Sequence, residues 1–304
     1  MESLKQTNEG AIPKIRQKFN WRRRWCITLL IAVVVVVIIV IVVPLAVIIP
    51  RNNRNRGKAS TVLFPAYIYP ETNSTWDPLY QALETYPDLK WVVVVNPSSG
   101  PGSSASPSTQ YATAVNRLST YSNVQKIGYV RTNYAKRNIT SVLADVETYS
   151  NWSTQSTSLA MDGIFFDEAP YEYTTASDEY LRQINKAVKS ATGLQSNRLI
   201  IHNPGTIPDS RFDDNSTDIT VTFEQSYSLF ETKEKILEGT LQSSERDRYA
   251  YILHSMPEMT NSSLKGFVNS LSRQAAYLFL TARNTSYYEE FDTGLNQFCS
   301  VVPT

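Results

Sequence analysis

Cysteine and histidine are both scarce in this 304-residue chain, which contains two of each. Two histidines without a cysteine cluster give little support for a zinc site, because zinc takes three or four Cys, His or carboxylate ligands. The two cysteines, Cys26 and Cys299, are too few for a disulfide scaffold, so the fold must rest on its hydrophobic core. An Asp/Glu site for magnesium or calcium stays open without a diagnostic spacing. We expect neither a metal nor a cofactor.

Three glycine-dependent motifs are also missing. No G-x-G-x-x-G follows a first strand, which argues against dinucleotide binding. The loop 96–102, NPSSGPG, contains glycines but lacks the G-x-x-x-x-G-K-[ST] pattern of a phosphate-binding loop. No G-x-S-x-G is present, which removes the nucleophile elbow of serine hydrolases.

Acidic residues are rare at the start of the chain and common afterwards. Residues 1–58 carry 11 Lys/Arg against two Asp/Glu, a net charge of +9, so the total of +1 leaves −8 on the remainder. An acidic module argues against a nucleic-acid partner, whose phosphates require a basic surface. It is compatible with a neutral or cationic polymer.

The one long apolar run, residues 27–49, contains no charge and predicts a membrane anchor. Its 23 residues can cross a hydrocarbon core of roughly 30 Å. A cleaved signal peptide is the alternative, but the run is longer than the usual apolar region and no clear cleavage site follows. Seven Lys/Arg precede the run and four follow closely, which places the N-terminus in the cytoplasm.

This pattern predicts a single-pass type II membrane protein. Residues 1–26 would form a basic cytoplasmic tail, residues 27–49 a signal anchor, residues 50–59 a stem, and residues 60–304 a module in the secretory pathway or at the cell surface. The membrane would then separate the two cysteines. Candidate N-glycosylation sites all follow the anchor: Asn73, Asn138, Asn151, Asn215, Asn261 and Asn284.

Apolar segments of strand length alternate with amphipathic segments of helix length throughout residues 60–304. Strands are expected at 62–67, 91–95, 124–130, 163–167, 199–202, 219–224, 249–254 and 276–281. Helices are expected at 76–86, 109–120, 139–152, 177–191, 229–237 and 264–277. Eight such units in about 245 residues match a (β/α)₈ barrel of roughly 250 residues. An open doubly wound sheet is the alternative.

The strand 219–224 indicates how its faces would be arranged. Every second residue from Ile219 is apolar, and the residues between them are Thr220, Thr222 and Glu224. We expect the apolar face to meet the helices and the Thr/Glu face to point into the barrel. In this fold the chemistry lies at the carboxyl ends of the strands, where Glu224 stands.

A second strand, 163–167, ends in the adjacent carboxylates Asp167 and Glu168. Two carboxyl groups delivered to one rim fit the cleavage of a glycosidic bond, which needs one proton donor and one ionised nucleophile or base. We predict Asp167 and Glu224 as that pair, with the two roles exchangeable, and Glu168 as an assistant. A structural ion pair at either position is the alternative, and so is a metal-dependent phosphodiesterase on the same fold.

Polar and aromatic residues at the other strand ends are candidates for binding a sugar. Aromatic rings pack on the C–H faces of pyranoses, and amides and imidazoles bond their hydroxyls. The predicted substrate-binding residues are Tyr67, Tyr69, Asn96, Tyr129, Arg131, His202, Asn203 and His254, and Tyr171 could line the same groove.

Five of these segments resemble one known family. They are PAYIYP (65–70), NPSSGPG (96–102), GYVRTNY (128–134), DGIFFDE (162–168) and NPG (203–205), in order across residues 60–300. The module is similar to the spherulin-4-like, spherulation-specific proteins of fungi and slime moulds, which are grouped as a glycoside hydrolase family with a (β/α)₈ barrel. The resemblance implies endo-hydrolysis of α-1,4-linked N-acetylgalactosamine in galactosaminogalactan, a polymer of fungal walls and biofilms. It carries the family's required acidic residues to Asp167, Glu168 and Glu224.

Residues and resemblance together predict a membrane-anchored endo-glycosidase whose partner is a galactosamine-rich polysaccharide. The alternative is a non-catalytic wall or spore-coat protein that binds glycan in the barrel groove. Retention or inversion of the anomeric configuration stays open, because it depends on the distance between the two carboxyl groups.

Overall fold

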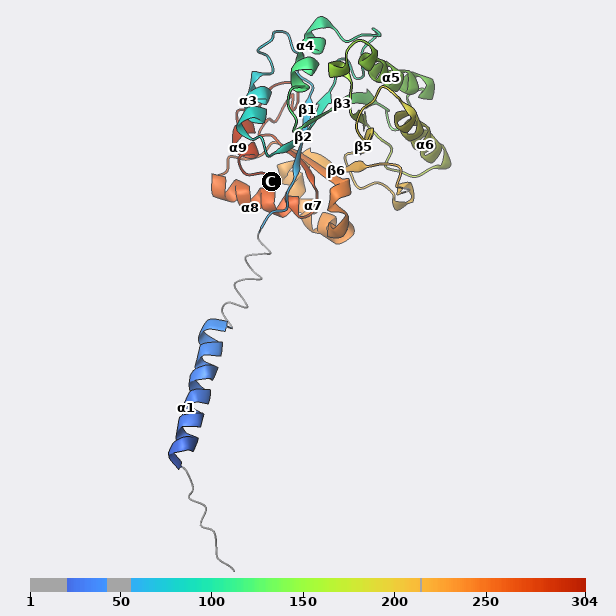
Figure 1. The fold of residues 1–304 in the computed structure, drawn as a ribbon. Helices are drawn as coiled ribbons and strands as arrows, with labels where there is room; N and C mark the ends of the chain where they lie inside the picture. Colours follow the sequence, from blue (N-terminus) through green and yellow to red (C-terminus); the bar gives the residue numbers. More distant parts are fainter. Residues whose placement is uncertain (1–20, 43–55, 214) are drawn as a thin grey trace, which may run out of the picture. The chain divides into compact units, whose positions relative to one another are not determined.

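The computed structural model describes residues 21–42, 56–213 and 215–304, and the chain divides into two compact units, residues 1–54 and 55–304 (Figure 1). The first unit contains α1 (Trp21–Val37) and a π-helical turn, η1 (Ile38–Val42). Among the described residues, no helix combines the length and the apolar character needed to cross a membrane. The last part of the predicted anchor, residues 43–49, lies outside the described residues, as do residues 1–20 of the predicted tail and most of the predicted stem.

The second unit is a closed barrel of eight parallel strands in sequence order, which confirms the predicted class and excludes an open sheet. Each strand lies within two residues of its expected ends. The strands are β1 (Thr61–Ala66), β2 (Lys90–Val95), β3 (Val124–Arg131), β4 (Gly163–Asp167), β5 (Leu199–Asn203), β6 (Ile219–Ser226), β7 (Tyr249–His254) and β8 (Tyr277–Leu280).

Helices surround the strands on the outside (Figure 1). They are α3 (Asp77–Thr85), α4 (Thr109–Leu118), α5 (Ile139–Asn151), α6 (Thr175–Ser190), α7 (Tyr227–Thr240), α8 (Asn261–Ser272) and a short α9 (Leu295–Cys299). Several begin at a side-chain cap that satisfies a free backbone N–H. Thr174 and Ser177 form a reciprocal capping box at the start of α6, and Asn138 caps α5.

Strand residues are buried on both faces because the barrel interior covers one face and the helices cover the other. In β2 every residue from Trp91 to Val95 is buried. The predicted apolar stripe of α6, Leu181, Ile184 and Val188, is buried against the barrel wall. Burial of both faces explains why the strands, such as β2, are almost continuously hydrophobic in sequence.

One connection departs from the repeating pattern. Between β5 and β6 the described residues hold no α-helix, only the 3₁₀ turn η4 (Ser210–Phe212). The outer face between β5 and β6 thus has no helix of its own, although α6 contacts β5 and α7 contacts β6. This gap leaves outward-facing side chains of β6 without a helix packed against them.

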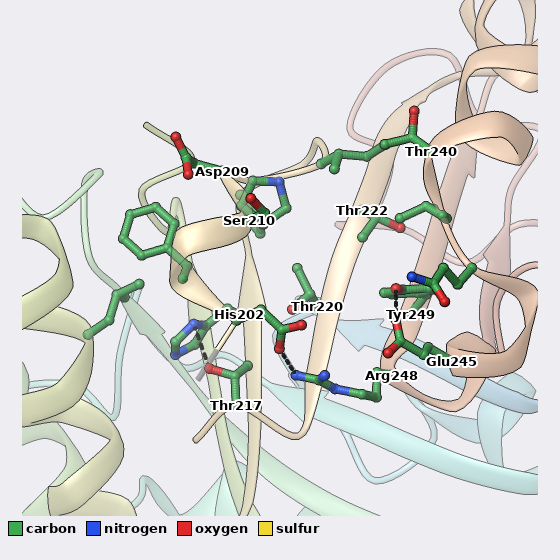
Figure 2. A pocket seen from close by; sticks show the side chains of 18 of the residues that line it. His202, Asp209, Ser210, Thr217, Thr220, Thr222, Thr240, Glu245, Arg248 and Tyr249 are labelled. Atoms are coloured by element: carbon green, nitrogen blue, oxygen red, sulfur yellow. Dashed lines mark hydrogen bonds and ion pairs between the residues drawn. The ribbon is translucent and has the colours of Figure 1, made fainter. Parts of the chain in front are cut away.

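The predicted faces of β6 were wrong for Thr220 and Thr222 and right for Phe223 and Glu224. Thr220 and Thr222 point away from the barrel interior and line a cavity on its outside (Figure 2). The pairing with β7 shifts register between Val221 and Phe223, which marks a β-bulge. Beyond the bulge Phe223 packs outward against Phe230 of α7, with ring centroids 5.3 Å apart. The bulge therefore restores Glu224 to the interior face, where it was expected.

Candidate active site

Three adjacent strands deliver the central residues of the site to one end of the barrel. Asp167 ends β4 and pairs in register with Asn203, which ends β5, while Glu224 lies near the end of β6. All three stand at the carboxyl ends of parallel strands, the end at which active sites of this fold lie. The structure therefore brings together the two carboxylates that the sequence pointed to.

A short hydrogen-bond network joins the two carboxylates. Asn203 Nδ2 donates to Asp167 Oδ1 at 2.7 Å and to Glu224 Oε2 at 2.5 Å. The Tyr129 hydroxyl donates to Asp167 Oδ2 at 2.6 Å, and the Tyr288 hydroxyl donates to Glu224 Oε1 at 2.7 Å. Both bonds start from the same nitrogen atom. The sum of their lengths, 2.7 and 2.5 Å, is therefore an upper limit for the distance between Asp167 Oδ1 and Glu224 Oε2.

Burial and mutual repulsion shift the ionisation of this pair. Desolvation, followed by the negative charge of Asp167, raises the pKa of Glu224 to about 7. Desolvation also raises the pKa of Asp167, although hydrogen bonds from Tyr129 and Asn203 oppose the rise. Two carboxylates this close cannot ionise independently, so near neutral pH the pair holds one proton more readily than either group would alone.

Glu168 is fixed beside the pair by the loop that follows β3. Thr132 Oγ1 donates to the carbonyl oxygens of Asp167 at 2.9 Å and Glu168 at 2.7 Å, and Arg131 Nε bonds the Glu168 carboxylate at 2.9 Å. Glu168 has φ of +51°, and the facing loop has three further left-handed residues, 133–135. Such conformations cost about 1–3 kcal/mol each and concentrate at functional sites.

Tyrosine rings form the wall around the carboxylates. Tyr67 contacts Tyr129 and Tyr288 edge to face, with centroids 5.2 and 5.7 Å away. Tyr134 and Tyr171 meet edge to face at 6.2 Å, and both rings are more than two-fifths exposed. Tyr67 and Tyr129 thus lie beside the carboxylates, and the contribution of these residues and Tyr171 to a sugar-binding groove stays a prediction.

Other predicted binding residues lie apart from the network. His202 neighbours Asn203 in β5 and therefore points to the opposite face, where its Nε2 bonds Asn185 Oδ1 at 2.8 Å; its assignment to the barrel mouth is corrected. Tyr69 packs on Tyr111 at 5.5 Å instead of on the carboxylates. Strand alternation accounts for the position of His202, and Tyr69 lies beyond the end of β1, after a bend at Ile68.

Two more predicted residues stand at the same end of the barrel without bonding the carboxylates. His254 ends β7, stacks on Tyr287 at 3.7 Å, and bonds Ser255 Oγ through Nδ1 at 2.9 Å. Burial lowers the pKa of His254. The side chain of Asn96 leaves its Oδ1 buried without a hydrogen-bond partner, while its backbone oxygen accepts from Tyr111 at 2.9 Å.

Tyr288 belongs to the hydrogen-bond network of the carboxylates and was missed by the sequence analysis. It lies in the connection after β8, well beyond the strand end at which the search for site residues stopped. The Tyr287-Tyr288-Glu289-Glu290 run after the last strand was an available signal, since it gathers aromatic and acidic groups at the end of the barrel that carries the chemistry.

The structure also describes possible metal ligands, the predicted glycosylation sites and Cys299. Within residues 21–42, 56–213 and 215–304, no group of three His, Cys, Asp or Glu side chains is placed to hold a metal ion. The asparagines of all six N-glycosylation motifs are exposed. Cys299 is buried, and burial raises the pKa of its thiol to about 12.

Comparison with known proteins gives consistent matches over the barrel. The model of the spherulation-specific family 4 matches residues 61–302. Spherulin-4 of Physarum polycephalum is 30% identical over 246 residues, which cover 79% of this chain and 69% of the relative. The crystal structure of Aspergillus clavatus Sph3 in complex with GalNAc aligns with a TM-score of 0.77 and 39% identity, covering 82% of this chain and 99% of Sph3.

Proposed function

This chain belongs to the spherulation-specific family 4, and from that membership and its paired carboxylates we propose that it is a glycoside hydrolase acting on an amino-sugar polysaccharide. The observation that carries the proposal is the bridging of Asp167 and Glu224 by Asn203 at the carboxyl end of the barrel. The GalNAc bound to the related Sph3 supports N-acetylgalactosamine as the sugar recognised. We propose α-1,4-linked N-acetylgalactosamine in a galactosaminogalactan-type polymer as the substrate.

The ionisation of the pair supports a division of roles. Glu224, whose pKa is raised to about 7, keeps a proton at the mildly acidic to neutral pH where it would protonate the leaving glycosidic oxygen. Asp167 accepts hydrogen bonds on both oxygens, from Tyr129 and Asn203, which favours its ionised form as the nucleophile. Glu168 and Arg131, paired at the rim, would contact sugar hydroxyls.

The separation of the carboxylates supports retention of configuration. Retaining glycosidases place their carboxyl groups about 5–5.5 Å apart, whereas inverting enzymes need roughly 6.5–9.5 Å to admit a water molecule. The two Asn203 bonds, 2.7 and 2.5 Å, keep the nearest oxygens of the pair closer together than the inverting separation. Asp167 would therefore attack the anomeric carbon as Glu224 protonates the leaving oxygen, and water would release the sugar in a second displacement. Proton NMR during the first minutes of cleavage tests this, because retention releases the α-anomer of the new reducing end first. Initial formation of the β-anomer would contradict it.

Two conservative variants test the proposed activity. Asp167→Asn and Glu224→Gln remove one ionisable group each without changing side-chain size, and we expect each to lower the rate of polymer cleavage by at least 100-fold. Asp77→Asn, at a surface ion pair with Arg117, is the matched control and should cleave normally. Mass spectrometry of the products gives the readout. Near-normal cleavage by either test variant would contradict the assignment, and polymer binding without shorter products would favour a glycan-binding protein.

We further propose that residues 27–49 anchor the chain in a membrane as a type II protein, with the barrel on the lumenal or extracellular side. The uncharged run and its basic N-terminal flank support this. In a secretory host, N-glycans should then be added to exposed sites such as Asn73 and Asn284. The mass loss after enzymatic deglycosylation measures this, with the Asn73→Gln and Asn284→Gln double variant as control. A full-length chain without glycans on membranes would count against the orientation.

A further inference from the structure

A cavity of about 240 Å³ lies on the outside of the barrel, behind the strands that carry the active site. It occupies the place of the helix that is absent between β5 and β6. Figure 2 shows its side chains converging from both strands, from η4 and from the segment after α7. A water molecule takes up about 30 Å³ in the liquid, so the cavity has room for a ring-sized ligand.

The cavity lining includes a buried polar atom without a partner. Thr222 is 2% exposed and its Oγ1 has no hydrogen-bond partner. An unmade hydrogen bond at a buried hydroxyl is unfavourable, so such groups in native proteins call for an explanation. Thr222 is also the extra residue at the β-bulge that returns Glu224 to the interior, and it belongs to the lining of the cavity.

The charged groups of the lining are already engaged with one another. Arg248 bonds Asp213 at 2.6 Å, Asp209 pairs with Arg211 at 2.6 Å, and the Tyr249 hydroxyl donates to Glu245 at 2.9 Å. An anionic ligand such as a phosphate would need an unpaired cation, which the described residues of this lining do not offer. The charge balance therefore favours an uncharged ligand.

The remaining lining is a mixture of hydroxyl and apolar groups. Thr220, Thr222 and Ser210 lie near Phe212 and Ile207. A purely apolar ligand would leave the Thr222 hydroxyl unsatisfied, whereas a pyranose has a rim of hydroxyls and apolar C–H faces. A neutral sugar ring matches both parts of this lining.

We propose that this cavity is a second carbohydrate site, which binds one neutral pyranose unit of the polysaccharide away from the reacting bond. The identity of the polymer rests on the proposed function, whereas the site itself rests on the cavity and on Thr222. A second site on the same chain holds a long polymer near the active site and raises its effective concentration. A short oligosaccharide gains nothing from it.

Two variants of the full-length chain test the proposal. Thr222→Val keeps the shape of the side chain and removes only the unpaired hydroxyl, and Thr220→Phe fills the cavity. Thr113→Val is the matched control, because Thr113 is exposed on α4 and its hydroxyl bonds its own helix at Thr109. Thermal unfolding shows whether each variant is folded, and Thr222→Val should unfold at or above the parent temperature because it removes an unsatisfied buried group.

Binding is measured in an Asp167→Asn background, with galactosaminogalactan as the probe. We expect Thr222→Val to weaken polymer binding about threefold to tenfold, the range for one hydrogen bond, and Thr220→Phe to weaken it at least as much. With Asp167 intact, KM for the polymer should rise in both variants, while cleavage of an N-acetylgalactosamine oligosaccharide of a few units stays within about twofold of the parent.

The outcomes separate this proposal from the proposed function. Polymer binding by folded Thr222→Val and Thr220→Phe equal to that of the parent would overturn the second site, even if the parent cleaves the polymer. A parent that binds the polymer through this cavity but produces no shorter chains would leave the second site standing and contradict the hydrolase assignment.

Discussion

The Tyr288 hydroxyl offers a direct test of the proposed role of Glu224. It donates to Glu224 Oε1 at 2.7 Å and so stabilises the ionised carboxylate, which holds the pKa below the value that burial alone would produce. In Tyr288→Phe this hydrogen bond is lost while the ring, which packs against Tyr67, is kept. The pKa of Glu224 must therefore rise.

The size of the rise follows from the strength of the bond. A hydrogen bond to a charged group contributes roughly 1.5–3 kcal/mol, and one pKa unit corresponds to about 1.4 kcal/mol. The bond from Asn203 to Glu224 remains, so the lower end of the range applies. We expect the pKa of Glu224 to move from about 7 to about 8 in the variant.

The pH dependence of kcat/KM reports this change. If Glu224 donates the proton, activity falls as the pH rises through its pKa, so the alkaline limb should move up by about one unit in Tyr288→Phe. Tyr287→Phe is the control: the neighbouring ring stacks on His254, and we expect its alkaline limb to stay in place. An alkaline limb that stays fixed or moves down in folded Tyr288→Phe would refute Glu224 as the acid.

Two further predictions concern stability. Because folding raises the pKa of Glu224 from 4.5 to about 7, its contribution to stability is fully present below pH 4.5 and is lost as the pH rises through 7. Glu224→Gln has no carboxyl group to ionise and should not show that loss. We therefore expect the difference in free energy of unfolding between variant and parent, measured by urea unfolding, to shift in favour of the variant by up to about 3 kcal/mol between pH 4.5 and pH 7.5. A difference that does not change with pH would contradict the raised pKa. Gly163→Ala places a Cβ 2.0 Å from the Leu199 carbonyl oxygen and should lower the unfolding temperature severely, whereas Gly239→Ala, in open space on α7, should leave it unchanged or raise it. Equal unfolding temperatures of these two variants would show that the contact between β4 and β5 relaxes freely.

Strand alternation decides most of what could be predicted about this site. Hydrophobic runs of four to eight residues separated by amphipathic stretches identified all eight strands within two residues, and the carboxyl ends of those strands identified Asp167, Asn203 and Glu224. The same alternation excludes that His202 and Asn203 share a face. Only one of these two neighbours can therefore point into the barrel. The sequence of β5 alone does not indicate which one does.

The bulge in β6 shows where the pattern fails. Regular alternation would place Thr222 and Glu224 on one face, yet the register shift puts Thr222 outside and Glu224 inside. The bulge depends on how β6 pairs with β7, and the outward position of Thr220 depends on how β6 pairs with β5. Both are contacts between segments distant along the chain.

The order of residues in this chain was enough to specify a barrel and the strand ends that carry its acids, because burial imposes its periodicity on each strand separately. The bond from Tyr288 to Glu224, the bridging of two acids by Asn203 and the cavity beside Thr222 exist only once the barrel has closed. Each joins groups from different strands and loops, and no local pattern records the distances between them.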